Sequence, residues 1–157
     1  MTSNDTWYFA YGSNMSVDRK IERTGTIRQA IRSCLSGYRL AFNKRASGGG
    51  VYANIMPNEA SEVWGVLYLC DEEAIQILNA KEGVAGGHYV PKSVSAQGPT
   101  GERFQCTTYV AGPKFICEDG IPSSDYLNYL VDGAREHDLP KWYIDEIRAT
   151  AKGTTSS

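Results

Sequence analysis

Much of the chain follows the hydrophobic pattern of β-strands, either as apolar and polar residues in alternation or as short continuous apolar runs. The segments with this pattern are residues 7–11, 27–35, 38–43, 51–56, 63–70, 89–95 and 104–110. Several of them are rich in aromatic and β-branched residues, which favour strands. The run 63–70 is apolar almost throughout, so we expect it to form a central strand.

Cap residues and helical spacing of apolar residues indicate helices between and after these strands. The predicted helices are residues 17–24, 72–81, 125–137 and 141–149. Ser16 and Asp71 stand where an N-cap is needed, and Gly25 can adopt the left-handed conformation that ends the first helix. Pro140 separates the last two helices, because proline interrupts a helix.

Clusters of turn-forming residues mark where the strands are expected to end. They lie at residues 12–14, 36–37, 46–50, 57–58 and 98–101. Strands dominate the middle of the sequence, with helices between and after them. The sequence therefore predicts an α+β fold, a small and mostly antiparallel β-barrel with flanking helices.

Length and charge limit the class of protein. A chain of 157 residues fits a single domain over 1–157, with polar ends at about 1–5 and 151–157 that we expect to be mobile. The net charge of −2 gives no basic surface for nucleic acid or an anionic membrane. We find no apolar run of about 20 residues that would span a bilayer and no signal-peptide core, so a cytoplasmic location is expected.

The four cysteines do not have the spacing of a metal site or a redox motif. Cys34, Cys70, Cys106 and Cys117 form no C-x-x-C pair, and the two histidines add no ligand spacing. In a cytoplasmic protein such cysteines are expected to be reduced thiols in or near the core. We therefore predict no metal.

The first feature that suggests chemistry is the turn from Tyr11 through Gly12 and Ser13 to Asn14. It leaves a predicted strand and enters a helix, so several backbone N–H groups lack partners and converge on one spot. Such a junction suits an anion, either a carboxylate or a phosphate. A plain strand–turn–helix connection is the alternative, since the P-loop pattern is absent.

The second feature is Glu82, where a predicted amphipathic helix meets the glycine loop that begins at Gly83. If its side chain points into a pocket, desolvation and the negative end of the helix dipole both raise its pKa. A raised carboxylate pKa is what a general base near neutral pH requires. The alternative is a solvated surface glutamate. His88 is a second acid–base candidate, and His137, at a helix end, is expected to be structural.

The third feature is the large number of tyrosines, ten in all. Most are expected to pack in the core or on the surface. Tyr11, Tyr89, Tyr109 and Tyr126 lie beside the first two features or in strands expected to border them. Their hydroxyls are candidates to fix a polar ligand. No G-x-S-x-G elbow is present, and no cysteine has a neighbouring histidine.

In order along the chain, several motifs resemble the γ-glutamylcyclotransferase family. They are the segments Phe9-Ala10-Tyr11-Gly12-Ser13-Asn14-Met15, Val63-Trp64-Gly65-Val66-Leu67-Tyr68, Glu82-Gly83-Val84 with Gly87 and Tyr89-Val90, residues 106–110, and Pro122-Ser123-Ser124-Asp125-Tyr126 with Gly133-Ala134 and Leu139-Pro140. The similarity extends over about residues 7–147. The Y-G-S-N form of the first motif resembles the branch that acts on γ-glutamyl amino acids.

The resemblance implies a β-barrel enzyme without a cofactor or metal, of lyase or acyltransferase type. It implies that Glu82 is the catalytic acid–base. It further implies that substrate is bound by Tyr8, Ala10, Tyr11, Gly12, Ser13, Asn14, Tyr89, Tyr109 and Tyr126. The glutamyl α-carboxylate would be held mainly by backbone N–H groups of the segment from Tyr8 to Asn14.

The implied reaction is attack of the glutamyl α-amine on the γ-amide carbonyl, which releases 5-oxoproline and an amine. The leaving amine stays open: it is an amino acid or dipeptide of glutathione metabolism, or an aminoglycoside-type secondary metabolite. The segments 85–88 and 112–121 depart from the family pattern and are expected near the leaving group. A non-catalytic γ-glutamyl-binding module and a γ-glutamyl hydrolase are the alternatives from other classes. The sequence allows a monomer or a homodimer.

Overall fold

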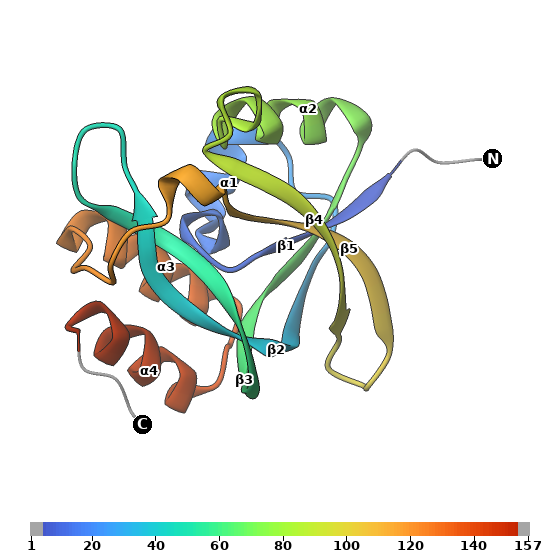
Figure 1. Cartoon of the computed structure of the whole chain (residues 1–157). Helices are drawn as coiled ribbons and strands as arrows, with labels where there is room; N and C mark the ends of the chain where they lie inside the picture. Colours follow the sequence, from blue (N-terminus) through green and yellow to red (C-terminus); the bar gives the residue numbers. More distant parts are fainter. Residues whose placement is uncertain (1–4, 154–157) are drawn as a thin grey trace.

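The computed structural model describes residues 5–153, which form a closed barrel with helices packed around it (Figure 1). The strands are β1 (Thr6–Ala10), β2 (Ala30–Arg45), β3 (Val51–Cys70), β4 (Tyr89–Gln97) and β5 (Arg103–Ala111). They close in the order β1-β3-β2-β4-β5, with antiparallel pairs except where β1 meets β5 in parallel. This arrangement confirms the predicted α+β barrel.

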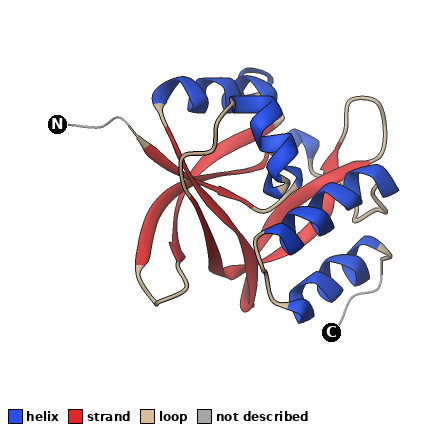
Figure 2. Ribbon diagram, turned by 180° about the vertical axis from the view of Figure 1, so that it is seen from behind, coloured by secondary structure: helices blue, strands red, loops and turns tan. Residues whose placement is uncertain are grey.

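All the predicted helices are present. They are α1 (Val17–Thr24), α2 (Glu72–Lys81), α3 (Ser124–Glu136) and α4 (Lys141–Ala151), with 3-10 turns η1 (Ser13–Met15), η2 (Val84–Gly86) and η3 (Pro113–Phe115). Figure 2 shows α3 and α4 side by side along one flank of the barrel. The predicted caps form: Ser16 Oγ accepts the N–H of Arg19 at 3.3 Å, and Asp71 Oδ1 accepts the N–H of Ala74 at 2.8 Å.

Two predicted strand breaks are wrong. The clusters at residues 36–37 and 57–58 lie inside the continuous strands β2 and β3. Ser36 pairs with Glu62 and Tyr38 pairs with Pro57, so residues 58–61 bulge opposite Gly37. Long-range pairing on both sides of the bulge prevails over the local turn preference, because a bulge absorbs extra residues without ending the ladder.

The core fills the barrel and continues under the helices. Fully buried side chains come from strands and helices alike, among them Phe9, Leu67, Leu78, Leu130 and Ile147. Burying one such side chain contributes roughly 1.5–3 kcal/mol to stability. The core thus fixes the helices against the barrel at positions that are far apart in the sequence.

The ends of the chain differ in part from the prediction. Residues 1–4 and 154–157, within the predicted mobile ends, lie outside the described residues. Ala151, also assigned to a mobile end, is instead the buried last residue of α4.

All four cysteines are free thiols, and Cys70 and Cys106 are buried. Between residues 5 and 153, no helix is both long and apolar enough to cross a membrane.

A close contact with α3 positions the turn after β1. A Cβ atom at Gly133 would lie 2.4 Å from the backbone carbon of Met15, so only glycine permits this approach. The hydroxyl of Tyr68 donates to the carbonyl oxygen of Met15 at 3.2 Å from the barrel side. The turn that includes η1 is therefore held between α3 and β3.

Candidate active site

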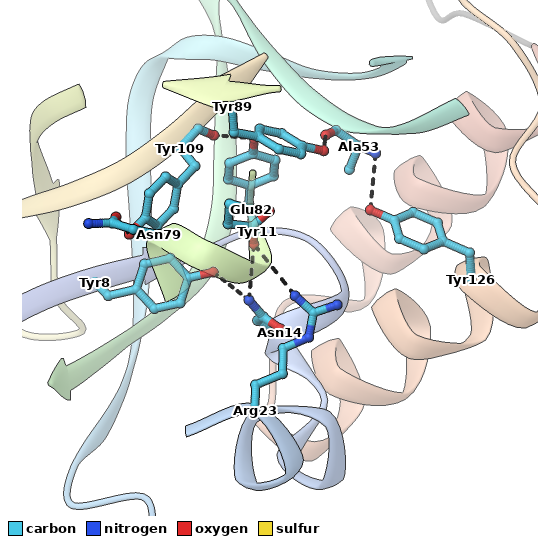
Figure 3. A network of polar contacts seen from close by, with 10 residues as sticks. All are labelled: Tyr8, Tyr11, Asn14, Arg23, Ala53, Asn79, Glu82, Tyr89, Tyr109 and Tyr126. Carbon is cyan, nitrogen blue, oxygen red and sulfur yellow. Dashed lines mark hydrogen bonds and ion pairs between the residues drawn. The ribbon is translucent and has the colours of Figure 1, made fainter. Parts of the chain in front are cut away.

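A pocket of about 320 Å³ opens where the end of β1, the C-terminal end of α2 and the first turn of α3 meet. Figure 3 shows the polar side chains that converge there. The predicted site residues that line it are Tyr8, Tyr11, Gly12, Ser13, Asn14, Glu82, Tyr89, Tyr109 and Tyr126. Ala10 is not among the lining residues: it is buried in β1 opposite Val66. The fold thus gathers segments far apart in the sequence.

The turn after β1 presents unpaired donors to this pocket. Within residues 5–153, no backbone carbonyl accepts the N–H groups of Gly12, Ser13 or Asn14. Met15 N–H bonds to the carbonyl of Gly12 at 3.0 Å, which closes η1, and Gly12, Ser13 and Asn14 all line the pocket. Unpaired backbone donors at such a turn form a ready site for an anion.

The side chain of Asn14 connects this turn to the rest of the site. Its Nδ2 donates to the hydroxyl oxygen of Tyr8 at 2.9 Å and lies 3.4 Å from Glu82 Oε1 (Figure 3). In the described part of the chain its Oδ1 has no hydrogen-bond partner, although the residue is buried. A buried acceptor without a partner is costly, so a donor that reached this oxygen would be bound favourably.

Glu82 caps the C-terminal end of α2, where its N–H bonds to the carbonyl of Leu78 at 2.8 Å. Its side chain is only 16% exposed, so the surface-glutamate alternative does not hold. Burial raises the pKa of this carboxyl above its ordinary value, as predicted, while Arg23 foremost, then Lys44, Arg19 and Asn14, act in the opposite direction. Arg23 Nη1 lies 3.8 Å from Oε1.

Tyr11 and Tyr109 form one wall of the pocket. The hydroxyl of Tyr11 donates to the carbonyl of Tyr109 at 2.5 Å, and the hydroxyl of Tyr109 donates to Asn79 Oδ1 at 2.6 Å. Burial raises the pKa of both phenols, so they are neutral near neutral pH. Both hydroxyl protons are donated to acceptors within the protein, and the two bonds fix the positions of the rings.

Tyr126 differs from these tyrosines because its hydroxyl oxygen is an acceptor. It accepts the backbone N–H of Ala53 at 3.0 Å, while Tyr89 donates to the carbonyl of Ala53 at 2.7 Å (Figure 3). Burial raises the pKa of Tyr126. Its own O–H is therefore retained and, since the residue lines the pocket, can be donated to a ligand.

The basic residues of the site were not among those predicted from the sequence. Arg19, Arg23 and Lys44 line the pocket. The spacing of Arg19 and Arg23 places both on one face of α1, which was a usable signal. Lys44 lies one residue beyond the predicted strand 38–43, and a register shift between Ala41 and Lys44 interrupts the alternation there.

The histidines lie in different environments. His88 lines the pocket, and its Nδ1 is 2.9 Å from Lys44 Nζ. His137 caps the end of α3, where its Nε2 lies 3.2 Å from the Tyr68 hydroxyl, and burial lowers its pKa. Among residues 5–153, no group of three or more His, Cys, Asp or Glu side chains is placed to hold a metal ion.

The chain is similar to known proteins over most of its length. The AIG2-like family matches residues 62–147. A Mus musculus protein named gamma-glutamylcyclotransferase is 30% identical over 149 residues, which are 90% of this chain and 77% of the relative. The Homo sapiens protein of the same name is 29% identical over 148 residues, with the same coverage.

Solved structures show the same fold. One titled "Gamma-glutamyl cyclotransferase" superposes with a TM-score of 0.85 at 27% identity, over 92% of this chain and 87% of that one. A yeast structure described as specific to glutathione has a TM-score of 0.71 at 12% identity over 96% of this chain and 97% of that one, which shows the fold alone. The class is thus that of the AIG2-like barrels. Within it, the chain belongs to the γ-glutamylcyclotransferase family, as its motifs predicted.

Proposed function

We propose that this protein is a γ-glutamylcyclotransferase in which Glu82 is the acid–base catalyst. The reaction releases 5-oxoproline and an amine from a small γ-glutamyl substrate. One observation supports the assignment of the site above all: a buried carboxylate with a raised pKa shares a pocket with an unpaired backbone-donor turn. The turn suits the substrate's α-carboxylate, and Glu82 suits its α-amine.

The turn formed by Gly12, Ser13 and Asn14, called the donor turn from here on, addresses the first requirement of the reaction. This requirement is to fold an extended glutamyl chain. If Gly12, Ser13 and Asn14 hold the α-carboxylate, the adjacent α-amine is directed toward Glu82. The glutamyl side chain then folds back so that its γ-carbonyl meets the amine. Arg19 and Arg23 add positive potential on this side of the pocket. Well-oriented intramolecular attack can lower a barrier by roughly 7–11 kcal/mol.

Glu82 solves the second problem, which is proton transfer. An α-ammonium has a pKa of about 8 and a free glutamate about 4.3, so an unassisted transfer costs about 5 kcal/mol. Burial of Glu82 reduces this mismatch. Glu82 takes one proton from the α-ammonium, and the free amine nitrogen bonds to the γ-carbonyl carbon. The bond from this carbon to the leaving nitrogen breaks as Glu82 gives its proton to that nitrogen. The ring nitrogen then passes its second proton to Glu82, which gives it up to the departing amine and returns to the carboxylate.

Release of 5-oxoproline from γ-glutamyl-alanine tests the proposal. The expected products are 5-oxoproline and alanine in equal amounts, measured by chromatography. Glutamate in place of 5-oxoproline would indicate the hydrolase alternative. Binding without either product would indicate the non-catalytic module.

We further propose that residues 1–157 form one domain that acts in the cytoplasm on a small molecule, without nucleic acid or membrane as partner. The net charge of −2 and the free state of all four cysteines support this proposal. A monomer and a homodimer are both compatible with it. Light scattering during size-exclusion chromatography distinguishes them, and imaging of a tagged protein tests the location.

A further inference from the structure

Lys44, the penultimate residue of β2, is a buried cation on the wall of the pocket. The residue is 3% exposed, and its Nζ lies 2.9 Å from His88 Nδ1. Three aromatic rings surround the ammonium group. Their centroids lie at 5.0 Å for Phe115, 5.3 Å for Tyr89 and 5.9 Å for Tyr52.

Among residues 5–153, no carboxylate forms an ion pair with this ammonium group, although the charge of Glu82 acts on it from farther away. The ion pairs among residues 5–153 involve Arg23, Arg28 and Arg39, and none includes Lys44. Aromatic faces and the contact with His88 Nδ1 offset part of the cost of burial, but an ammonium has three donors. Buried charges are normally paired, so Lys44 is suited to an anion that enters the pocket.

Lys44 has different direct contacts from Arg23, although the charges of both act on Glu82. Arg23 contacts Glu82, whereas the contacts of Lys44 are with His88 and the rings of Tyr52, Tyr89 and Phe115. The donor turn and Arg23 serve the glutamyl α-carboxylate in the proposed function. Lys44 is therefore available for a second anionic group of the same substrate, beyond the γ-amide.

The segment after β5 holds His88 in position. Gly112 N–H bonds to the carbonyl of His88 at 2.9 Å, and a Cβ on Gly112 would lie 1.8 Å from the carbonyl oxygen of Gly87. The ring of Phe115 stacks on His88 at 4.0 Å between centroids. The two divergent segments, 85–88 and 112–121, thus meet at Lys44.

We propose that Lys44, positioned by His88, binds a carboxylate on the leaving amine and makes this enzyme selective for anionic leaving groups. The inference rests on the proposed function and adds a specificity-determining residue to it. Within the described chain, the lining residues include Arg19, Arg23, Lys44 and Lys81, but of carboxylates only Glu82. A substrate with two carboxylates complements this surplus of positive charge, whereas a polycationic aminoglycoside-type leaving group is repelled.

The test compares γ-glutamyl-alanine with γ-glutamyl-ethylamine, which differ by the leaving-group carboxylate. We expect the wild type to prefer γ-glutamyl-alanine by at least about tenfold in kcat/KM, as for a charge-assisted hydrogen bond. Lys44→Met should abolish this preference, and Lys44→Arg should keep most of it. Lys92→Met, on an exposed position of β4, is the matched control and should leave the preference unchanged.

The decisive quantity is the ratio of kcat/KM for γ-glutamyl-alanine to kcat/KM for γ-glutamyl-ethylamine. Lys44 also lowers the pKa of Glu82, so Lys44→Met alters both activities through the base, but this effect cancels in the ratio. His88→Leu should reduce the preference through KM for γ-glutamyl-alanine, and His88→Gln, which keeps an acceptor, should restore it.

Equal kcat/KM for the two substrates in the wild type would overturn the inference, and so would a preference that survives Lys44→Met. In both cases 5-oxoproline is still released, so the proposed function stands. Because the wild-type comparison needs no variant, a misfolded Lys44→Met protein does not prevent the test. If neither substrate yields 5-oxoproline, the proposed function fails and the inference fails with it.

Discussion

Asn14 and Glu82, 68 residues apart in the chain, meet through the Nδ2 of one and the Oε1 of the other at 3.4 Å. This contact joins the donor turn after β1 to the C-terminal end of α2. Because the donor turn is proposed to hold the α-carboxylate and Glu82 the α-amine, the contact fixes the spacing of two groups attached to one substrate carbon.

Replacing Glu82 with Gln tests the base directly. The amide keeps the size of the side chain and an acceptor for Asn14, so we expect the fold and substrate binding to persist. It cannot accept the amine proton, so turnover should fall at least about 100-fold. The measurement is 5-oxoproline release at saturating substrate, with thermal unfolding as the check on folding. Retention of a tenth of the activity would exclude Glu82 as the base and leave His88 as the candidate.

The pH dependence should follow the environment of Glu82. A general base must be deprotonated, so kcat/KM falls as the pH decreases through its pKa, which burial has raised. Arg23 opposes that rise. Arg23→Met should therefore raise the pKa further and move the acid limb to higher pH.

The matched control for this profile is Arg39→Met. Arg39 pairs with Asp119 at 3.8 Å and is not among the residues that line the pocket. Its loss should leave the acid limb unchanged. An acid limb that stays in place in Arg23→Met, or moves to lower pH, would contradict the assignment of the limb to Glu82.

Tyr126→Phe should weaken binding more than turnover. The variant loses the O–H that is free to contact the glutamyl group and leaves the N–H of Ala53 without its acceptor. We expect a higher KM with kcat nearly unchanged, and a loss of about 1 kcal/mol in the free energy of unfolding. Steady-state kinetics and urea denaturation measure the two effects.

Tyr129→Phe is the control for Tyr126, since Tyr129 lies in the same helix with 37% of its surface exposed. It should change neither KM nor stability. A large loss of kcat at saturating substrate in Tyr126→Phe would instead assign Tyr126 a direct part in the chemical step.

Gly133→Ala should destabilise the protein through the contact between α3 and the donor turn. The added Cβ would meet the backbone of Met15 at 2.4 Å, and backbone cannot move aside as a flexible side chain can. Overpacking of this kind costs about 1–3 kcal/mol. Gly48→Ala, where a Cβ has nothing within 4 Å, is the control. Equal unfolding free energies for the two variants in urea would refute the contact.

The sequence alone placed Glu82 well, because local signals define both ends of its helix. Asp71 caps the start, and Gly83 has the left-handed conformation just past the end. Local signals also define α1, and with it the junction that carries the donor turn. Where capping residues define the ends of a helix, the prediction agrees with the structure.

Local signals of this kind do not specify contacts between residues that are far apart in the sequence. The bond from Tyr11 to Tyr109 joins residues 98 apart, and no local pattern specifies it. The continuity of β2 and β3 was missed for the same reason, since pairing across the sheet outweighs a local Pro57 signal. Lys44 was missed because the predicted strand ended at residue 43, whereas β2 continues to Arg45 after a register shift that the alternation does not reveal.

Because of the bulge at residues 58–61, the number of residues in the chain can change there without a change in the geometry of the site. The ladder between β2 and β3 is fixed independently on each side of it, by Ser36 with Glu62 and by Tyr38 with Pro57. Residues added to an ordinary strand shift its register and turn side chains to the wrong face. Here an insertion leaves both registers intact and keeps Ala53 beside Tyr126. During divergence, length variation can therefore accumulate at this position while the catalytic pocket is inherited unchanged.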